Sequence, residues 1–141
     1  MSKLKFDILS LTWGLPLTLI GAVVATILMV CGYRPKVWGY CCYFEVGDNW
    51  GGLNLGMVFL ISKNTNDFTK THEFGHAIQN CYYGPFMLFI VSIPSAIRYW
   101  YRSYLINVLK ISESKLPDYY SIWFERQANE FGNTLIKRLG E

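Results

Sequence analysis

The chain has 141 residues, of which 52% are hydrophobic, 17% aromatic and only 16% charged, whereas ordinary soluble domains carry about 25% charged residues. These proportions exclude a disordered chain, the length fits one domain, and a net charge of +3 without a concentrated basic stripe excludes nucleic-acid binding. Five Trp and ten Tyr in so hydrophobic a chain favour a small membrane protein, because these side chains gather at membrane interfaces.

The first apolar run covers residues 8–33 and contains no charged side chain. About 20 apolar residues span the hydrocarbon core of a bilayer, so this run is long enough for one crossing. Gly14 and Pro16 bend its first turns, which a membrane helix tolerates. The run is longer than the apolar core of a secretory signal, and no clear cleavage site follows it. Residues 1–33 are therefore expected to form an uncleaved N-terminal transmembrane anchor.

The chain changes character after this run. Residues 36–44 are rich in Val, Trp, Tyr and Phe, which predicts a strand. Turn-forming residues follow, and residues 53–62 are again strand-like, so a β-hairpin is the simplest interpretation. A polar loop then leads into a helix that is expected to start near Thr71.

A second uncharged run covers residues 77–97 and is interrupted by polar residues, Gly and a central Pro94. Its hydropathy is compatible with a second span, a re-entrant hairpin or a helix lying in the membrane interface. Residues 98–115 are amphipathic and basic, and residues 119–139 predict a last helix.

The two histidines of the chain, His72 and His76, belong to the sequence T-H-E-F-G-H-A, which is an H-E-x-x-H motif. Residues four apart lie on one face of a helix, so both imidazoles can bind one metal ion. Glu73 is then placed beside that face, where it can act on a metal-bound water. The alternative is a pair of helix-surface histidines with no ligand.

A catalytic zinc site usually has three protein ligands and a water molecule in its fourth position, so a third ligand is needed besides the two histidines. Glu125 is the best candidate, because it falls in the predicted last helix among apolar side chains. Asn129 lies one turn later on the same face, where it can accept a hydrogen bond from a ligand imidazole and fix its orientation. The alternative for Glu125 is a surface salt bridge. The other downstream acids are Glu113, Asp118, Glu130 and Glu141.

These motifs resemble those of the gluzincin metallopeptidases. The E-x-x-A-N run that begins at Glu125 is similar to the E-x-x-A-D run of the integral-membrane gluzincins of the CAAX prenyl-protease and HtpX type. The resemblance implies that His72, His76 and Glu125 bind Zn²⁺ and that Glu73 is the general base. Asn129 stands where the family has an Asp, and its uncharged amide implies weaker support of the imidazole. The rest of the chain does not match the family's multi-span layout, so its substrates are not carried over.

The resemblance also implies a place for substrate. In zincins an edge strand before the H-E-x-x-H helix binds the substrate backbone, and main-chain hydrogen bonds of this kind supply affinity. Within residues 53–62 the candidates for this contact are Leu53, Leu55, Gly56 and Val58. The alternative is a hairpin that only packs over the helix.

The oxyanion of a tetrahedral intermediate needs a hydrogen-bond donor besides zinc. Tyr119, Tyr120 and Arg126 are the nearby donors in the sequence. The sequence gives no basis for choosing among them.

The order of the motifs constrains the topology. His72 and His76 precede the second apolar run and Glu125 follows it, and a full crossing would separate its two ends by about 30 Å. Residues 84–104 are therefore expected to form a membrane-dipping helical hairpin, or an interfacial helix, bent at Pro94. The alternative is an ordinary second span with no shared metal site.

The sequence thus predicts a mostly helical α+β membrane protein, with the anchor followed by a minimal zincin-like domain over residues 34–141. We expect a zinc-dependent endopeptidase that acts on membrane-associated proteins or peptides. The alternative is a non-catalytic membrane module that binds metal or a partner protein. Lys and Arg are more numerous after the first run than before it, which favours a catalytic part facing the cytoplasm at a bacterial inner membrane.

Overall fold

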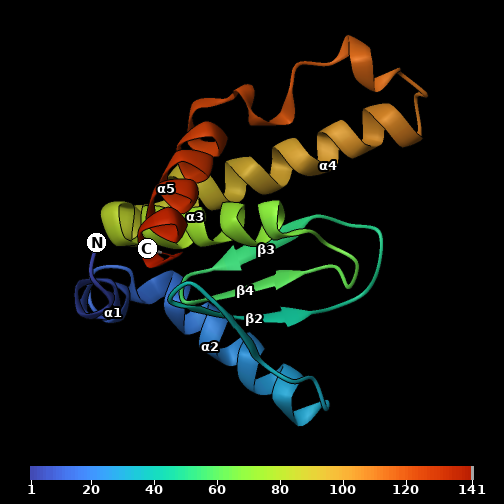
Figure 1. Cartoon of the computed structure of the whole chain (residues 1–141). Helices are drawn as coiled ribbons and strands as arrows, with labels where there is room; N and C mark the ends of the chain where they lie inside the picture. The colour runs from blue at the N-terminus through green and yellow to red at the C-terminus, as the bar shows by residue number, and fades with distance from the viewer. Residues whose placement is uncertain (141) are drawn as a thin grey trace.

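The computed structural model describes residues 1–140, which form a four-stranded sheet between helices (Figure 1). The sheet comprises β1 (Lys36–Trp38), β2 (Cys41–Glu45), β3 (Gly52–Leu55) and β4 (Val58–Ile61). The α-helices are α1 (Lys3–Leu11), α2 (Leu15–Val30), α3 (Asp67–Tyr83), α4 (Ile93–Asn107) and α5 (Trp123–Gly140). Short helical turns are η1 (Gly84–Phe86), η2 (Leu88–Ser92), η3 (Glu113–Lys115) and η4 (Tyr119–Ser121).

Alternation along the strands places two helices on opposite faces of the sheet, because successive strand side chains point to opposite sides. One set of buried strand residues packs with Phe74, Ala77 and Ile78 of α3, and it includes Cys41, Tyr43, Phe59 and Ile61. The other set packs with Ala25 of α2, and it includes Phe44 and Val58. The helix that carries the H-E-x-x-H motif is therefore fixed against the sheet by its apolar side.

The strand order is β1-β2-β4-β3, with β2 and β4 parallel and β3 antiparallel to β4 at one edge. The predicted hairpin between residues 36–44 and 53–62 is therefore wrong. Residues 53–62 contain a tight turn of their own at Gly56, which has a positive φ of 78° and donates its N–H to the Asn54 side chain at 2.9 Å. That turn makes β3 and β4 a hairpin and leaves β3 as the edge strand.

The predicted N-terminal transmembrane helix is also wrong, because the first apolar run is divided between α1 and α2, which are bent by 92°. The break is held from a distant part of the chain, since Asn80 of α3 donates its side-chain N–H to the Gly14 carbonyl at 3.0 Å. Pro16 then starts α2, where its missing N–H costs no helix hydrogen bond.

The membrane-dipping hairpin predicted for residues 84–104, with its bend at Pro94, is a third error. The chain turns earlier. Gly84 ends α3 with a positive φ of 56°, and a bend of 116° separates the helical segment that ends at Phe86 from the one that begins at Leu88. Pro94 lies in the first turn of α4, directly after η2, whose wider π-helical turn accommodates the proline.

Within residues 1–140 no single helix is long and apolar enough to cross a membrane. Two pairs of helical segments reach the length and apolar composition of a membrane span only when both members of a pair are counted together. They are Lys3–Leu11 with Leu15–Val30, and Asp67–Phe86 with Leu88–Asn107.

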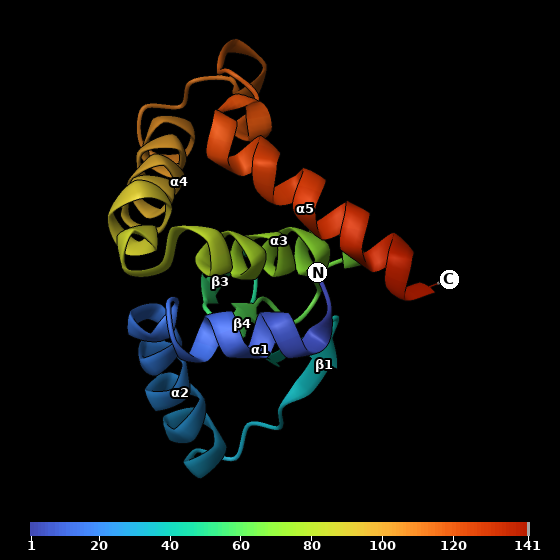
Figure 2. The same ribbon diagram turned by 90° about the vertical axis from the view of Figure 1, so that its left-hand side faces the viewer.

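Helix α5 crosses α3 on the side away from the sheet. Figure 2 shows α3 between the sheet and α5. A Cβ atom added at Gly75 of α3 would lie 1.8 Å from the Ala128 carbonyl oxygen, and one added at Gly132 of α5 would lie 2.1 Å from the Thr71 carbonyl oxygen. The two backbones therefore approach so closely that only glycine fits at both positions.

We expect Gly132→Ala to lower the free energy of unfolding by about 1–3 kcal/mol, because overpacking at a helix contact forces the backbones apart. Urea unfolding followed by circular dichroism measures the change. Gly140→Ala is the matched control on the same helix, since a Cβ there meets nothing within 4 Å. Equal stability of the two variants would contradict the close crossing.

Candidate metal centre

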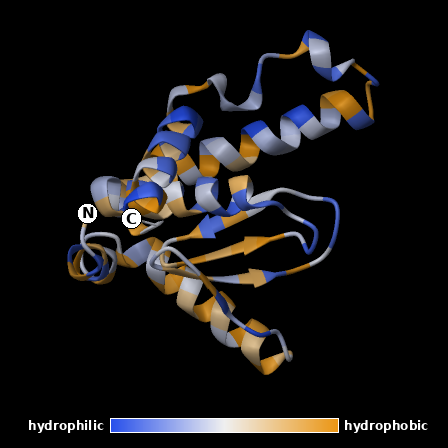
Figure 3. Cartoon of the chain, in the orientation of Figure 1, coloured by the Kyte–Doolittle hydropathy of each residue, from blue (hydrophilic) through white to orange (hydrophobic). Residues whose placement is uncertain are grey.

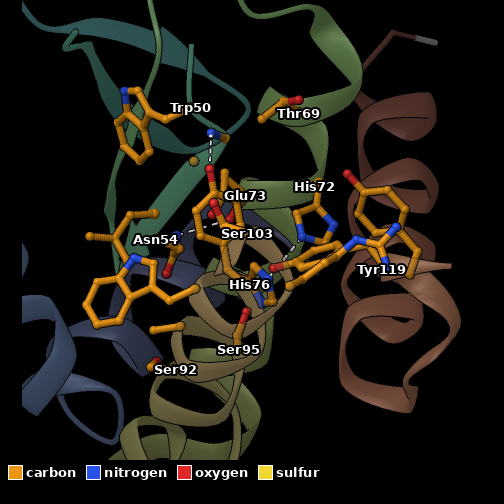
Figure 4. Close-up of a pocket in the computed structure, with 18 of the residues that line it drawn as sticks. Trp50, Asn54, Thr69, His72, Glu73, His76, Ser92, Ser95, Ser103 and Tyr119 are labelled. Carbon is orange, nitrogen blue, oxygen red and sulfur yellow. Dashed lines mark hydrogen bonds between the residues drawn. The ribbon is translucent and has the colours of Figure 1, made fainter. Parts of the chain in front are cut away.

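Three buried side chains converge on one point between α3 and α5. His72 and His76 project from the same face of α3, and their Nε2 atoms lie 3.1 Å apart. Oε2 of Glu125, in the first turn of α5, lies 2.9 Å from Nε2 of His72 and 3.3 Å from Nε2 of His76. The structure thus brings together the three residues proposed from the sequence as metal ligands (Figure 4 shows both imidazoles).

This triangle fits a zinc ion. Ligands arranged as a tetrahedron around zinc at about 2.1 Å lie about 3.4 Å from one another, close to the three separations here. Among the described residues 1–140, Oε2 of Glu125 is one of the few buried side-chain oxygens that accept no hydrogen bond. Buried polar atoms normally have a hydrogen-bond partner, so this oxygen is available to bind a cation. Two imidazoles and one carboxylate form a donor set that suits zinc.

The other nitrogen of each imidazole is held by an amide. Nδ1 of His72 lies 2.7 Å from Oδ1 of Asn129, and Nδ1 of His76 lies 2.7 Å from Oε1 of Gln79. An amide oxygen accepts a hydrogen bond, so each Nδ1 carries the proton and each Nε2 keeps its lone pair for a metal. Asn129 lies beside His72, as its spacing from Glu125 predicts, whereas no sequence pattern had indicated Gln79.

The position of Gln79 could have indicated its role. It follows His76 by three residues on the same helix, and residues three apart on a helix are neighbours. Its amide nitrogen donates to the Phe124 carbonyl at 2.8 Å and to Oε1 of Gln127 at 3.0 Å. The residue that orients one histidine therefore also ties α3 to the start of α5, next to Glu125.

Glu125 is fully buried, and its second oxygen, Oε1, accepts a hydrogen bond from the Ser95 hydroxyl of α4. Burial raises the pKa of this carboxyl, but hydrogen bonds and positive charge from His72 and His76 outweigh burial when these imidazoles are protonated, and they then hold the pKa below its usual range. Ser95 thus occupies one carboxylate oxygen and leaves the other facing the two histidines.

Glu73, the expected general base, lies between the metal centre and the edge strand. Its backbone carbonyl accepts a hydrogen bond from the Asn54 side chain at 3.0 Å, and its carboxylate lies over Gly52, where a Cβ would come within 2.6 Å of Oε1. Burial raises the pKa of Glu73 to about 7; the charge of His72 acts in the opposite direction, and that of Glu125 adds to the rise.

The candidate metal centre opens into a cleft of about 660 Å³ between β3, α3 and α4. Figure 4 shows Trp50, Asn54, Glu73, Ser95 and Tyr119 around it. The part of β3 that borders this cleft comprises Gly52, Leu53 and Asn54, preceded by Trp50 and Gly51.

Of the four residues proposed as substrate contacts, only Leu53 borders the cleft. Leu55 is buried in a cluster with Leu17. Gly56 packs against Thr18, and Val58 belongs to the inner strand β4 and faces α2. The tight turn at Gly56 is responsible, because it carries everything after Leu55 away from the edge.

Two of the three proposed oxyanion donors border the cleft. Tyr119 and Tyr120 both line it, and the ring of Tyr120 lies edge-on to His72 with their centroids 5.1 Å apart. Burial raises the pKa of both phenols above the usual value, and the charges of Glu73 and Glu125 add to this, so both phenols carry their protons at neutral pH. Arg126 is exposed and lies outside the lining.

We expect the purified chain to bind close to one zinc per molecule, and His76→Ala and Glu125→Ala to lose it, because each variant removes one of three ligand atoms. Elemental analysis after dialysis measures the content. Glu130→Ala removes an exposed acid of the same helix and should keep the metal. Zinc retained by Glu125→Ala would exclude Glu125 as the third ligand.

We expect Asn129→Ala to weaken zinc binding by about 10- to 100-fold, because the Nδ1–H of His72 loses its acceptor. Asn129→Asp should strengthen binding, since a carboxylate is a stronger acceptor than an amide. Competition with a fluorescent zinc chelator gives the affinities, and Asn133→Ala, at an exposed position of α5, is the control. If Asn129→Ala and Asn129→Asp both bind zinc as tightly as the wild type and the control do, Asn129 does not support the site.

No protein-family model, curated protein or solved structure matches this chain.

Proposed function

We propose that the chain is a zinc-dependent metallopeptidase. The observation that carries this proposal is the convergence of Nε2 of His72, Nε2 of His76 and Oε2 of Glu125 within 3.3 Å of one another. A second carboxylate, Glu73, borders the same cleft. A metal held only for structure is usually closed off by four protein ligands, whereas three ligands beside a cleft leave a position for reacting groups.

Zinc at such a centre supplies Lewis-acid catalysis and lowers the pKa of water. The remaining chemistry falls to the side chains of the chain. Glu73 is positioned to take a proton from the attacking water and to pass it to the leaving amine. Tyr119 and Tyr120, protonated at neutral pH, are the hydrogen-bond donors available to a developing oxyanion.

A peptide is the substrate that the cleft supports best, because one wall is the edge strand β3. An edge strand has unpaired main-chain groups along one side, and an extended peptide can add to it as a further strand. Gly52 lets the Glu73 carboxylate lie directly against β3, whereas the N–H of Gly51 already donates to the Tyr99 hydroxyl at 3.4 Å, so an added strand would pair with β3 beyond Gly51. The carbonyl to be cleaved would then lie between β3 and the metal centre, next to Glu73.

We expect Glu73→Gln to retain zinc and to lose hydrolysis of a fluorogenic extended-peptide library by about 100-fold or more, because the amide cannot accept the proton. A chelator should abolish hydrolysis by wild type, and added Zn²⁺ should restore it. Glu130→Gln is the matched control, since this exposed acid of α5 lies outside the cleft.

Two outcomes would reject the peptidase. Undiminished hydrolysis by Glu73→Gln would exclude the proposed general base. Full zinc occupancy without hydrolysis of peptides or unfolded proteins would identify a non-catalytic metal-binding module instead.

A further inference from the structure

Helix α4 has its polar and apolar sides reversed relative to a helix of a water-soluble domain. Its polar side faces the protein, where Ser95 binds Glu125 and Arg98 donates to the carbonyls of Asp118 and Tyr119 at 2.9 and 2.8 Å. Its outer side is apolar and aromatic. No residue of α4 is buried, and the large exposed side chains at helical spacing are Ile93, Ile97, Trp100, Tyr101 and Tyr104.

The outer side of α2 continues this surface. Its exposed stripe consists of Leu19, Val23, Ile27 and Val30, whose exposed fractions range from 55% to 83%. The two helices are joined by packing of Leu17 with Met87 and Val91 of the η2 region, and by the rings of Trp13 and Phe86, whose centroids are 6.3 Å apart. Figure 2 shows α2 and α4 along the same edge of the molecule, away from α5, and Figure 3 shows apolar residues along α2.

We name the outer sides of α2, η2 and α4 together the apolar face. In η2 it adds Phe89 and Ile90, both exposed. The three segments together expose many large apolar side chains, and exposed apolar surface of this extent marks an interaction site.

Helices α2 and α4 and the η2 segment between Leu88 and Ser92 contain no acidic residue, although Glu113, from a later segment, pairs with Arg102 of α4 at 3.5 Å. The chain has no Asp or Glu from residue 8 to residue 44, and none from residue 74 to residue 112. The segments that build the face therefore carry only cations, and Arg34 and Lys110 follow the ends of α2 and α4. Such a surface is complementary to anionic lipid headgroups.

The composition of the exposed side of η2 and α4 favours a lipid surface. It combines aliphatic side chains and Phe89 with the exposed rings of Trp100, Tyr101 and Tyr104. Amphipathic aromatic rings beside aliphatic side chains are typical of helices that lie in a membrane interface.

We propose that the apolar face docks this protein onto an anionic lipid surface, with α2 and α4 lying in the interface. Trp100, which is 70% exposed, also lines the cleft, so docking places the mouth of the cleft at the lipid surface. An amphiphilic or lipid-bound peptide would enter it from there. This last step rests on the proposed peptidase, whereas docking itself does not.

The test is co-sedimentation of the purified full chain with vesicles of phosphatidylglycerol and phosphatidylcholine, after removal of detergent. We expect binding that weakens in pure phosphatidylcholine. Ile93→Gln/Ile97→Gln and Val23→Gln/Ile27→Gln should each bind at least about tenfold more weakly, since each removes two apolar contacts with lipid. Val37→Gln is the control, because Val37 is 76% exposed on β1, outside the apolar face.

Circular dichroism and zinc content verify that each variant is folded. The proposal would be overturned if the wild-type protein is monodisperse and does not bind the vesicles. It would also be overturned if Val37→Gln and the two double variants of the apolar face bind equally well. Self-association of wild type that the face variants abolish, without vesicle binding, would assign the face to a second copy of the chain. His76→Ala should bind vesicles like wild type, so failure of the metal centre and failure of docking are distinguishable.

Discussion

The contact between the backbones of α3 and α5 is the constraint on which the site depends. Gly75 of the H-E-x-x-H helix lies against the Ala128 carbonyl, and Gly132 lies against the Thr71 carbonyl. This contact places Glu125, one turn before Ala128, directly opposite His72 and His76. A larger residue at either glycine would separate the helices, and the three ligand atoms would no longer meet. The packing of α3 against α5 thus positions Glu125 without reference to any metal.

The parts of the site that depend on one helix were predictable from the sequence. A spacing of four residues places His72 and His76 on one face of any helix, and the same rule places Asn129 beside Glu125. The sheet was not predictable in this way. Its central pairing joins β2 to β4 in parallel, and only the small turn at Gly56 reveals that residues 53–62 form two strands. That turn also explains why three of the four proposed substrate contacts lie outside the cleft.

The prediction of the first helix from hydropathy was wrong because it, too, depends on a contact that is distant in the sequence. The length and composition of residues 8–33 suit one membrane crossing, but the bend at Gly14 is stabilised by Asn80, which lies far away in the sequence. A local pattern contains no information about such a partner. Pro94 led to an error of the opposite kind. It is the most conspicuous helix breaker of its segment, yet the helical stretch from Leu88 to Asn107 continues through it, because the wider π-helical turn of η2 accommodates the proline.

The manner in which α4 is attached has a mechanical consequence. Ser95, Arg98 and Arg102 hold it through hydrogen bonds to Glu125 and to the carbonyls of residues 117–119, and no side chain of α4 is buried in the core. Hydrogen bonds can be exchanged for water one at a time, whereas a packed apolar contact is lost as a whole. We therefore expect this wall of the cleft to open locally at a lower free-energy cost than unfolding of the whole molecule. Because the Ser95 hydroxyl is one of the groups that attach α4, outward movement of the wall would release one oxygen of Glu125, so widening of the cleft is coupled to the position of this candidate ligand.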